Sequence, residues 1–271
     1  MMNKIRIILG YLFSFILSVL IFLLCLTLII KVNTNKDNVK AILIKNNYYE
    51  NVYNEILKEM QNYMVSSGLS GEVLDDIFTK DIVKNDIDTY IDNLYLGKTN
   101  KVDTSNIEEK LTTNINNYLQ EHNLKFTDQK SLNLFKKDIA DIYSDEINLY
   151  NLLNGFTNHV NKLIKLLNIT IIGLIISIIV LFICNLLLKV KYMGSILSAS
   201  GLMLILSKYL ILNNIEIDYV TIITDNFSKI IRIIFTNINH TLIIIGLFLF
   251  IIGIFINIFM SNKSNKVLKN N

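Results

Sequence analysis

The sequence predicts an all-α polytopic membrane protein with four transmembrane helices and an extracytoplasmic helical bundle inserted between helices 1 and 2. Three observations predict this fold: long apolar runs, charges confined to the pieces between them, and a helical repeat of apolar residues in the longest polar piece. An apolar run of about 18 or more residues can cross a hydrocarbon core of about 30 Å. The four runs are Ile5–Ile30, Ile164–Leu188, Met193–Leu212 and Thr241–Met260.

The first run is expected to be a retained membrane anchor. It is longer than the apolar core of a signal peptide, which has about 7–15 residues, and no small-x-small cleavage site follows it. Residues 1–31 are therefore predicted to form an N-terminal cytoplasmic stub and the first transmembrane helix.

The distribution of charge predicts the orientation in the bilayer. The N-terminal stub, the turn after Leu188 and the C-terminal tail carry only basic residues, and all 23 acidic residues lie in the other two polar pieces. Short basic flanks remain in the cytoplasm. Both termini are thus expected to be cytoplasmic, with residues 32–162 and 213–240 extracytoplasmic. The basic residues form no cluster that could follow a phosphate backbone, so nucleic acid is not expected as a partner.

Residues 32–162 are predicted to form a helical domain. Apolar residues recur at spacings of three and four from Tyr48 to Met64 and from Thr79 to Leu96, which is typical of amphipathic helices. Gly97 suits the end of the second helix, and Ser70 suits the cap of a short turn between the two.

Two more helices are expected further along this domain. Ser105 and Glu108 have the spacing of a capping box at a helix start. Thr127 or Asp128 begins the last helix, with a break near Gly155 before the second apolar run. A segment of this length with four or five helices can bury its own core.

Residues 163–271 are predicted to hold three transmembrane helices, an outer amphipathic segment at about 215–238 and a basic cytoplasmic tail. The apolar stripe from Val220 to Phe235 suits a helix in the membrane interface. It suits equally a helix packed under the outer domain, and a re-entrant segment is a third interpretation.

The third apolar run carries small residues on one face, namely Gly194, Ser198 and Gly201. Small residues let helix backbones approach closely in lipid. The face is therefore expected to pack inside the four-helix set, with a dimer or partner interface as the alternative.

Polar residues at the outer surface are the only candidates for chemistry. No zinc-hydrolase, P-loop or nucleophile-elbow motif occurs in the sequence. We therefore assign no catalytic, cofactor-binding or metal residues and expect no cofactor. A speculative outer cluster comprises His159, Lys208, Asp225, Arg232 and His240.

The layout resembles a set of uncharacterised four-helix membrane proteins of clostridia and related low-GC Gram-positive bacteria. The stretches that carry the resemblance are Asn46-Asn47-Tyr48-Tyr49-Glu50, Ser67-Gly68-Leu69 with Asp76-Ile77-Phe78-Thr79, and Asp86-Ile87-Asp88-Thr89-Tyr90-Ile91-Asp92. The resemblance implies an N-terminal anchor, a helical outer domain and three closely spaced membrane helices. It implies no activity.

These features favour a non-enzymatic envelope scaffold or accessory subunit that binds a partner through its outer domain. The expected partners are the lipid bilayer and a protein partner or a second copy of the chain. A transporter or permease component is the first alternative, favoured by the compact helix triplet. A membrane enzyme acting on lipid or cell-wall substrates is the second.

Overall fold

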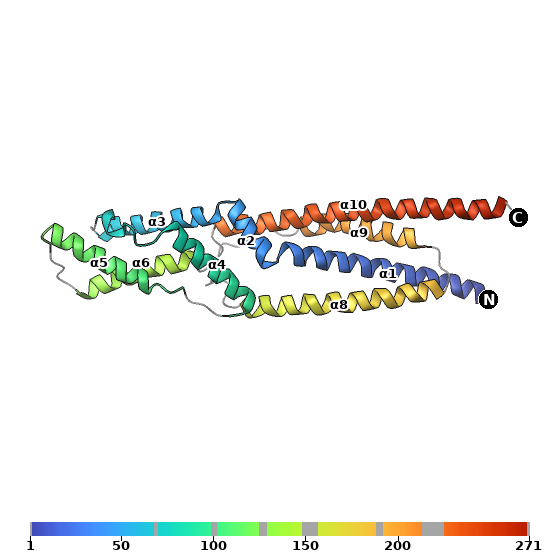
Figure 1. Cartoon of the computed structure of the whole chain (residues 1–271), viewed down its shortest axis with the longest axis horizontal. Helices are drawn as coiled ribbons and strands as arrows, with labels where there is room; N and C mark the ends of the chain where they lie inside the picture. The colour runs from blue at the N-terminus through green and yellow to red at the C-terminus, as the bar shows by residue number, and fades with distance from the viewer. Residues whose placement is uncertain are drawn as a thin grey trace. The chain divides into compact units, whose positions relative to one another are not determined.

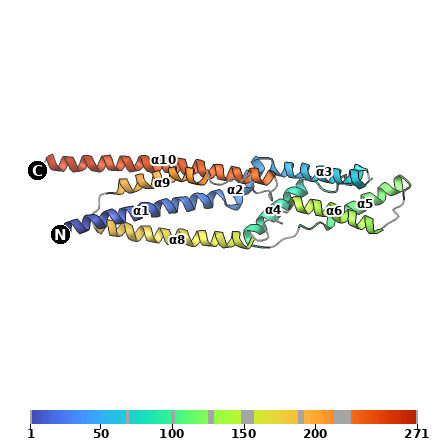
Figure 2. The same cartoon turned by 180° about the vertical axis from the view of Figure 1, so that it is seen from behind.

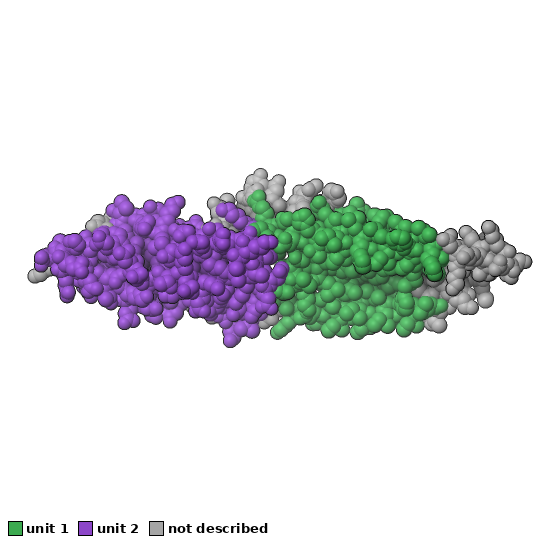
Figure 3. All heavy atoms as spheres, turned by 45° about the horizontal axis from the view of Figure 1, so that its top comes forward, with its two compact units in different colours: residues 1–35, 163–219, 232–271 green, residues 36–162, 220–231 purple. Residues whose placement is uncertain are grey.

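The computed structural model describes residues 2–67, 70–98, 102–124, 129–147, 157–187, 192–212 and 225–269. All regular structure within these ranges is helical, with no strand, so the prediction of an all-α chain is confirmed. The chain forms two compact units (Figure 3). Unit 1 comprises Met1–Asn35, Leu163–Tyr219 and Arg232–Asn271, and unit 2 comprises Lys36–Lys162 and Val220–Ile231.

Unit 1 contains all or most of four helices: α1 (Met2–Asn33), α8 (Thr157–Leu187), α9 (Met193–Leu212) and α10 (Asp225–Lys269) (Figure 1). Three spans among the described residues are long and apolar enough to cross a membrane: Ile7–Asn33, Ile164–Cys184 and Ser228–Met260. The apolar part of α9, Met193–Lys208, is a shorter helix. Three predicted runs are thus confirmed as membrane-length helices, and a fourth crossing stays a prediction.

Helix α10 joins two segments that are expected from the sequence to be separate. It runs for 45 residues from Asp225 to Lys269, so the described part of the amphipathic segment continues directly into the fourth apolar run. No glycine or proline stands between Asp225 and Ile245 to end the helix. Residues 213–224, where the amphipathic segment begins, lie outside the described ranges.

Unit 2 is built from α2 (Lys36–Lys45), α3 (Tyr48–Ser67), the 3-10 helix η1 (Gly71–Leu74), α4 (Lys80–Leu96), α5 (Ser105–Glu121) and α6 (Gln129–Ile147). The two amphipathic helices predicted at Tyr48–Met64 and Thr79–Leu96 correspond to α3 and α4. Helix α2 is not among the predicted helices, and Asn47, with a positive φ of 52°, separates it from α3.

The caps of unit 2 follow the sequence closely, with one exception. Ser70 accepts a hydrogen bond from the Glu72 N–H, Thr79 accepts one from the Ile82 N–H, and Gly97 ends α4 in the left-handed region with φ 68°. The predicted capping box at Ser105 is wrong because Thr104 occupies the N-cap without a side-chain cap.

An acidic side chain takes over the role of that capping box. The Ser105 N–H donates to the Asp103 carboxylate at 3.0 Å. Hydrogen bonds from the Ser105 side chain and from its N–H hold the pKa of Asp103 below its usual range. The starts proposed at Thr127 and Asp128, and the break near Gly155, lie outside the described residues.

Each unit has its own apolar core. In unit 2 the side chains of Ile56, Met60, Val83, Leu111 and Ile139 are fully buried, and they come from four different helices. In unit 1 a cluster joins Ile29 of α1, Leu204 of α9, and Ile238 and Leu242 of α10. The core of unit 1 therefore lies among α1, α9 and α10.

Candidate functional site

Two pairs of glycines bring α9 and α10 into close contact in unit 1. A Cβ atom added to Gly201 would lie 2.5 Å from the carbonyl oxygen of Gly246, and one added to Gly253 would lie 2.5 Å from that of Gly194. Real Cβ atoms do not approach oxygen so closely. The backbones of the two helices are therefore in direct contact.

The register of these pairs fixes the direction of the helices. Gly194 and Gly201 are seven residues apart, as are Gly246 and Gly253, and the first glycine of α9 meets the second of α10. The two helices are thus antiparallel, and they touch once every two turns. Such close approach favours helix association in lipid, where van der Waals packing drives assembly.

Polar side chains flank the glycine contact. Ser198 lies between the two glycines of α9, and its Oγ donates to the carbonyl oxygen of Phe250 at 3.4 Å. The Asn257 amide nitrogen donates to the Ser195 Oγ, also at 3.4 Å. The structure thus places Gly194, Ser198 and Gly201 together against α10, whereas sequence analysis identified neither Gly246 nor Gly253 as their partners.

A second face of α9 packs on α1. The Ser200 Oγ lies 2.9 Å from the carbonyl oxygen of Ser18 and 2.8 Å from that of Ile196 in its own helix, so one hydroxyl bridges two helices. Towards the start of both helices, the rings of Tyr11 and Tyr192 stack with centroids 4.8 Å apart. These contacts occur in the same order along the two helices, so α1 and α9 are parallel (Figures 1 and 2).

Buried polar residues accompany the apolar core of this three-helix contact. Every buried polar residue that the structure describes lies on α1, α9 or α10. They are Ser14, Ser18, Asn33, Ser200, Ser207 and Asn239. None of these residues is charged.

Three of these polar residues share one level. Each lies about one turn from a residue of the apolar cluster: Asn33 from Ile29, Ser207 from Leu204, and Asn239 from Leu242. All three are displaced towards the C-terminal ends of α1 and α9. Each is buried and donates to a carbonyl oxygen of its own helix. We call these three residues the polar layer.

One acceptor in the polar layer has no donor within the described part of the chain. The Asn239 side chain is 3% exposed, its Nδ2 donates to Phe235, and its Oδ1 accepts no hydrogen bond. A buried carbonyl oxygen without a donor costs about 1–3 kcal/mol. Asn239 was not identified by sequence analysis, because its burial depends on which face of α10 meets α9.

The five residues of the speculative outer cluster lie on three helices. Gly201 of α9 faces Gly246 of α10, and the two helices are antiparallel. Seven residues further along α9, Lys208 therefore lies at the same height as Asn239, seven residues earlier on α10. Arg232 and His240 are exposed on α10, eight residues or about 12 Å apart. His159 lies in α8 and Asp225 begins α10, but their side chains are outside the described set.

Unit 2 uses its tyrosines to hold helices together. The Tyr49 hydroxyl donates to Asp88 and the Tyr143 hydroxyl donates to Asp86, each at 2.7 Å, and Tyr63 contacts Asp138. These contacts join α3 to α4, α6 to α4, and α3 to α6. Burial raises the pKa of Asp86, and the hydrogen bond from Tyr143 opposes that shift.

One carboxyl group in unit 2 has a strongly shifted acidity. Burial raises the pKa of Glu146 to about 7, and the nearby charges of Glu59, Glu55 and Asp145 act in the same direction. Glu146 and Asp145 belong to α6, and the two other carboxylates belong to α3. The facing surfaces of α3 and α6 therefore concentrate negative charge.

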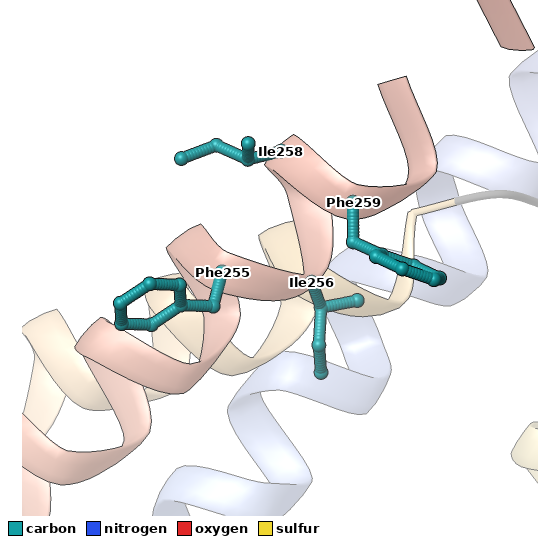
Figure 4. Close-up of a pocket in the computed structure, with 4 residues that line it drawn as sticks. All are labelled: Phe255, Ile256, Ile258 and Phe259. Atoms are coloured by element: carbon teal, nitrogen blue, oxygen red, sulfur yellow. The ribbon is translucent and has the colours of Figure 1, made fainter. Parts of the chain in front are cut away.

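A shallow apolar hollow lies beside α10, lined by Phe255, Ile256, Ile258 and Phe259 (Figure 4). All four residues come from this one helix, within the span that is long enough to cross a membrane. Three of them, Phe255, Ile258 and Phe259, are more than half exposed. The hollow is thus an uneven part of an apolar helix surface.

No group of three His, Cys, Asp or Glu side chains that could hold a metal ion occurs within the described ranges. No protein-family model, no curated protein and no solved structure matches the chain. Its function is therefore inferred from its residues and their contacts.

Proposed function

We propose that this chain is a non-enzymatic envelope scaffold or accessory subunit, anchored by packed membrane helices and binding a protein partner through unit 2. The observation that carries the proposal is the direct backbone contact between α9 and α10 at Gly194–Gly253 and Gly201–Gly246. A solute path needs space between helices, and this contact leaves none between these two. A tight contact of this kind suits an anchor.

The proposal includes four membrane crossings with both termini in the cytoplasm. The parallel pairing of α1 with α9 and the antiparallel pairing of α9 with α10 support it, because helices that cross alternately have these relative directions. Basic flanks at the N-terminus, after Leu188 and at the C-terminus support the orientation. In this arrangement α9 crosses despite its shorter apolar part, and residues 32–162 are extracytoplasmic.

The role of unit 2 as the binding surface is supported by its internal contacts. Its helices bury an apolar core and are joined by hydrogen bonds from tyrosine to aspartate. A preorganised domain loses less entropy on binding than a flexible one. Exposed apolar side chains, such as Leu134 at 52% exposure, are the residues through which unit 2 is proposed to bind.

In-cell crosslinking of the full chain, followed by extraction and mass spectrometry, tests this proposal. Recovery of a partner in stoichiometric amount supports the scaffold function. The partner should be lost from the variant Leu134→Glu and kept by the control Lys137→Glu, which replaces a neighbouring exposed residue. Recovery of the chain alone contradicts it. Recovery of a homo-oligomer identifies the partner as a second copy.

A transporter or permease component remains the second candidate because the buried polar residues of unit 1 gather on α1, α9 and α10. Alanine substitutions separate the candidates. A scaffold tolerates Ser14→Ala and Asn239→Ala, whereas a solute path lined by these residues changes its flux. A membrane enzyme is expected to lose activity when the five residues of the outer cluster are replaced by alanine.

A further inference from the structure

The exposed side of α10 changes from polar to apolar residues along its length. Arg232, Thr236 and His240 are exposed at successive spacings of four residues. Beyond them the exposed residues are apolar, beginning with Ile244 at 67% and Leu247 at 45% exposure. Ile251, Ile254 and Ile258 continue this apolar surface.

The length of the apolar part matches a bilayer. Thr241–Met260 contains no charged residue and, at about 1.5 Å per residue, measures about 30 Å. A hydrocarbon core has about this thickness, and the headgroup regions add about 5–8 Å on each side. If Ile244 and Leu247 face acyl chains, His240 lies at the level of the headgroups, on the same exposed side.

The polar residues of this side can recognise phosphate. Arg232 carries a permanent charge in a planar donor group suited to phosphate oxygens. It lies about 12 Å above His240, and its charge attracts anionic headgroups over a distance of about one Debye length. No acidic residue occurs from Asn226 to Met260, so no carboxylate on this part of α10 opposes an anion.

We propose that Arg232 and His240 form a headgroup contact on α10 that concentrates anionic phospholipids around the helix. Thr236 lies between them, and its hydroxyl donates to the Arg232 carbonyl oxygen at 2.8 Å. The partner is the phosphate-bearing headgroup of a bilayer lipid with net negative charge. The contact is separate from the protein-binding role of unit 2 and requires only that α10 cross a bilayer. Electrostatic attraction of this kind enriches anionic lipid about two- to five-fold for one arginine near the surface.

The absence of tryptophan from the chain permits a direct test. A single tryptophan introduced by Leu247→Trp lies seven residues beyond His240, in the apolar part of the same side. The full chain is placed in liposomes of equal phosphatidylcholine and phosphatidylglycerol, with one or the other lipid brominated on its acyl chains. Quenching of the tryptophan by each brominated lipid measures the lipid composition beside α10.

The expected result is a two- to five-fold enrichment of phosphatidylglycerol at this tryptophan, falling towards one in the double variant Arg232→Gln/His240→Gln. The control Lys84→Gln, an exposed charge in unit 2, keeps the enrichment. Quenching in fully brominated liposomes confirms that each variant still places the tryptophan in lipid. Equal quenching by the two lipids in the parent protein, or enrichment that survives the double substitution, overturns the proposal.

Discussion

Gly201 determines how closely α9 can approach α10. The substitution Gly201→Ala puts a Cβ atom 2.5 Å from the Gly246 carbonyl oxygen, so the helices must separate. We expect a loss of about 1–3 kcal/mol of stability, the usual cost of overpacking. The measurement is unfolding of the full chain in detergent micelles.

Gly173 of α8 provides a matched control for this substitution. A Cβ atom at Gly173 has nothing within 4 Å, so Gly173→Ala is expected to leave stability unchanged or slightly improved. An equal loss from the two substitutions would contradict the direct contact between α9 and α10.

Glu146 makes the stability of unit 2 depend on pH. Its pKa is about 7 in the folded chain against an ordinary value of 4.5, so the folded state binds more protons between these two values. Stability therefore falls as pH rises from about 4.5 to about 7. We expect the amides of α3 and α6 to exchange faster at pH 8 than at pH 5, after correction for intrinsic exchange rates.

The substitution Glu146→Gln tests whether this carboxyl group is responsible. It removes the ionisable group, so the difference between the two pH values should shrink, and protection at pH 8 should exceed that of the parent. The exposed Glu109→Gln serves as the control. If the pH dependence is unchanged in Glu146→Gln, other groups cause it.

Helix α4 illustrates how capping fixes an element. The Thr79 side chain accepts a hydrogen bond from the Ile82 N–H, and its loss in Thr79→Ala is expected to cost about 1 kcal/mol. Thr104 occupies the same position in α5 without a side-chain cap, so Thr104→Ala should cost much less. Thermal unfolding monitored by circular dichroism compares the two variants, and similar losses would contradict the difference in capping.

The helices that could be predicted from sequence are those whose periodicity extends over several turns. Both α3 and α4 have apolar residues at spacings of three and four over 17 residues or more. Helix α2 has only ten residues and buries two of them, Ile42 and Leu43, so its pattern is too short to stand out. The continuity of α10 was missed because a change from amphipathic to wholly apolar sequence looked like a boundary.

The candidate site was predictable only in part. The small face of α9 was evident from the spacing of Gly194, Ser198 and Gly201, but its partner depended on pairing with a helix more than 40 residues away. Gly246 and Gly253 repeat the seven-residue spacing of Gly194 and Gly201, and this match is the sequence feature that indicates the pairing of the two helices. The burial of Asn239 depends on the rotation of α10, which no local pattern records.

At the scale of the whole chain, alternating helix directions lead to a testable topology. A reporter that fluoresces only in the cytoplasm should be active when fused to the C-terminus. An epitope inserted after Lys98, between α4 and α5, should be accessible to antibody in cells whose membrane is intact. Antibody access only after permeabilisation would contradict the extracytoplasmic placement of unit 2.

The reciprocal glycines of α9 and α10 also constrain how the gene can change. Any missense substitution at one of these four glycine codons adds a side chain where a backbone already lies. The partner position cannot compensate, because no residue is smaller than glycine. Selection for suppressors of a Gly201 lesion should therefore yield reversions or changes that displace a helix, and none at Gly246.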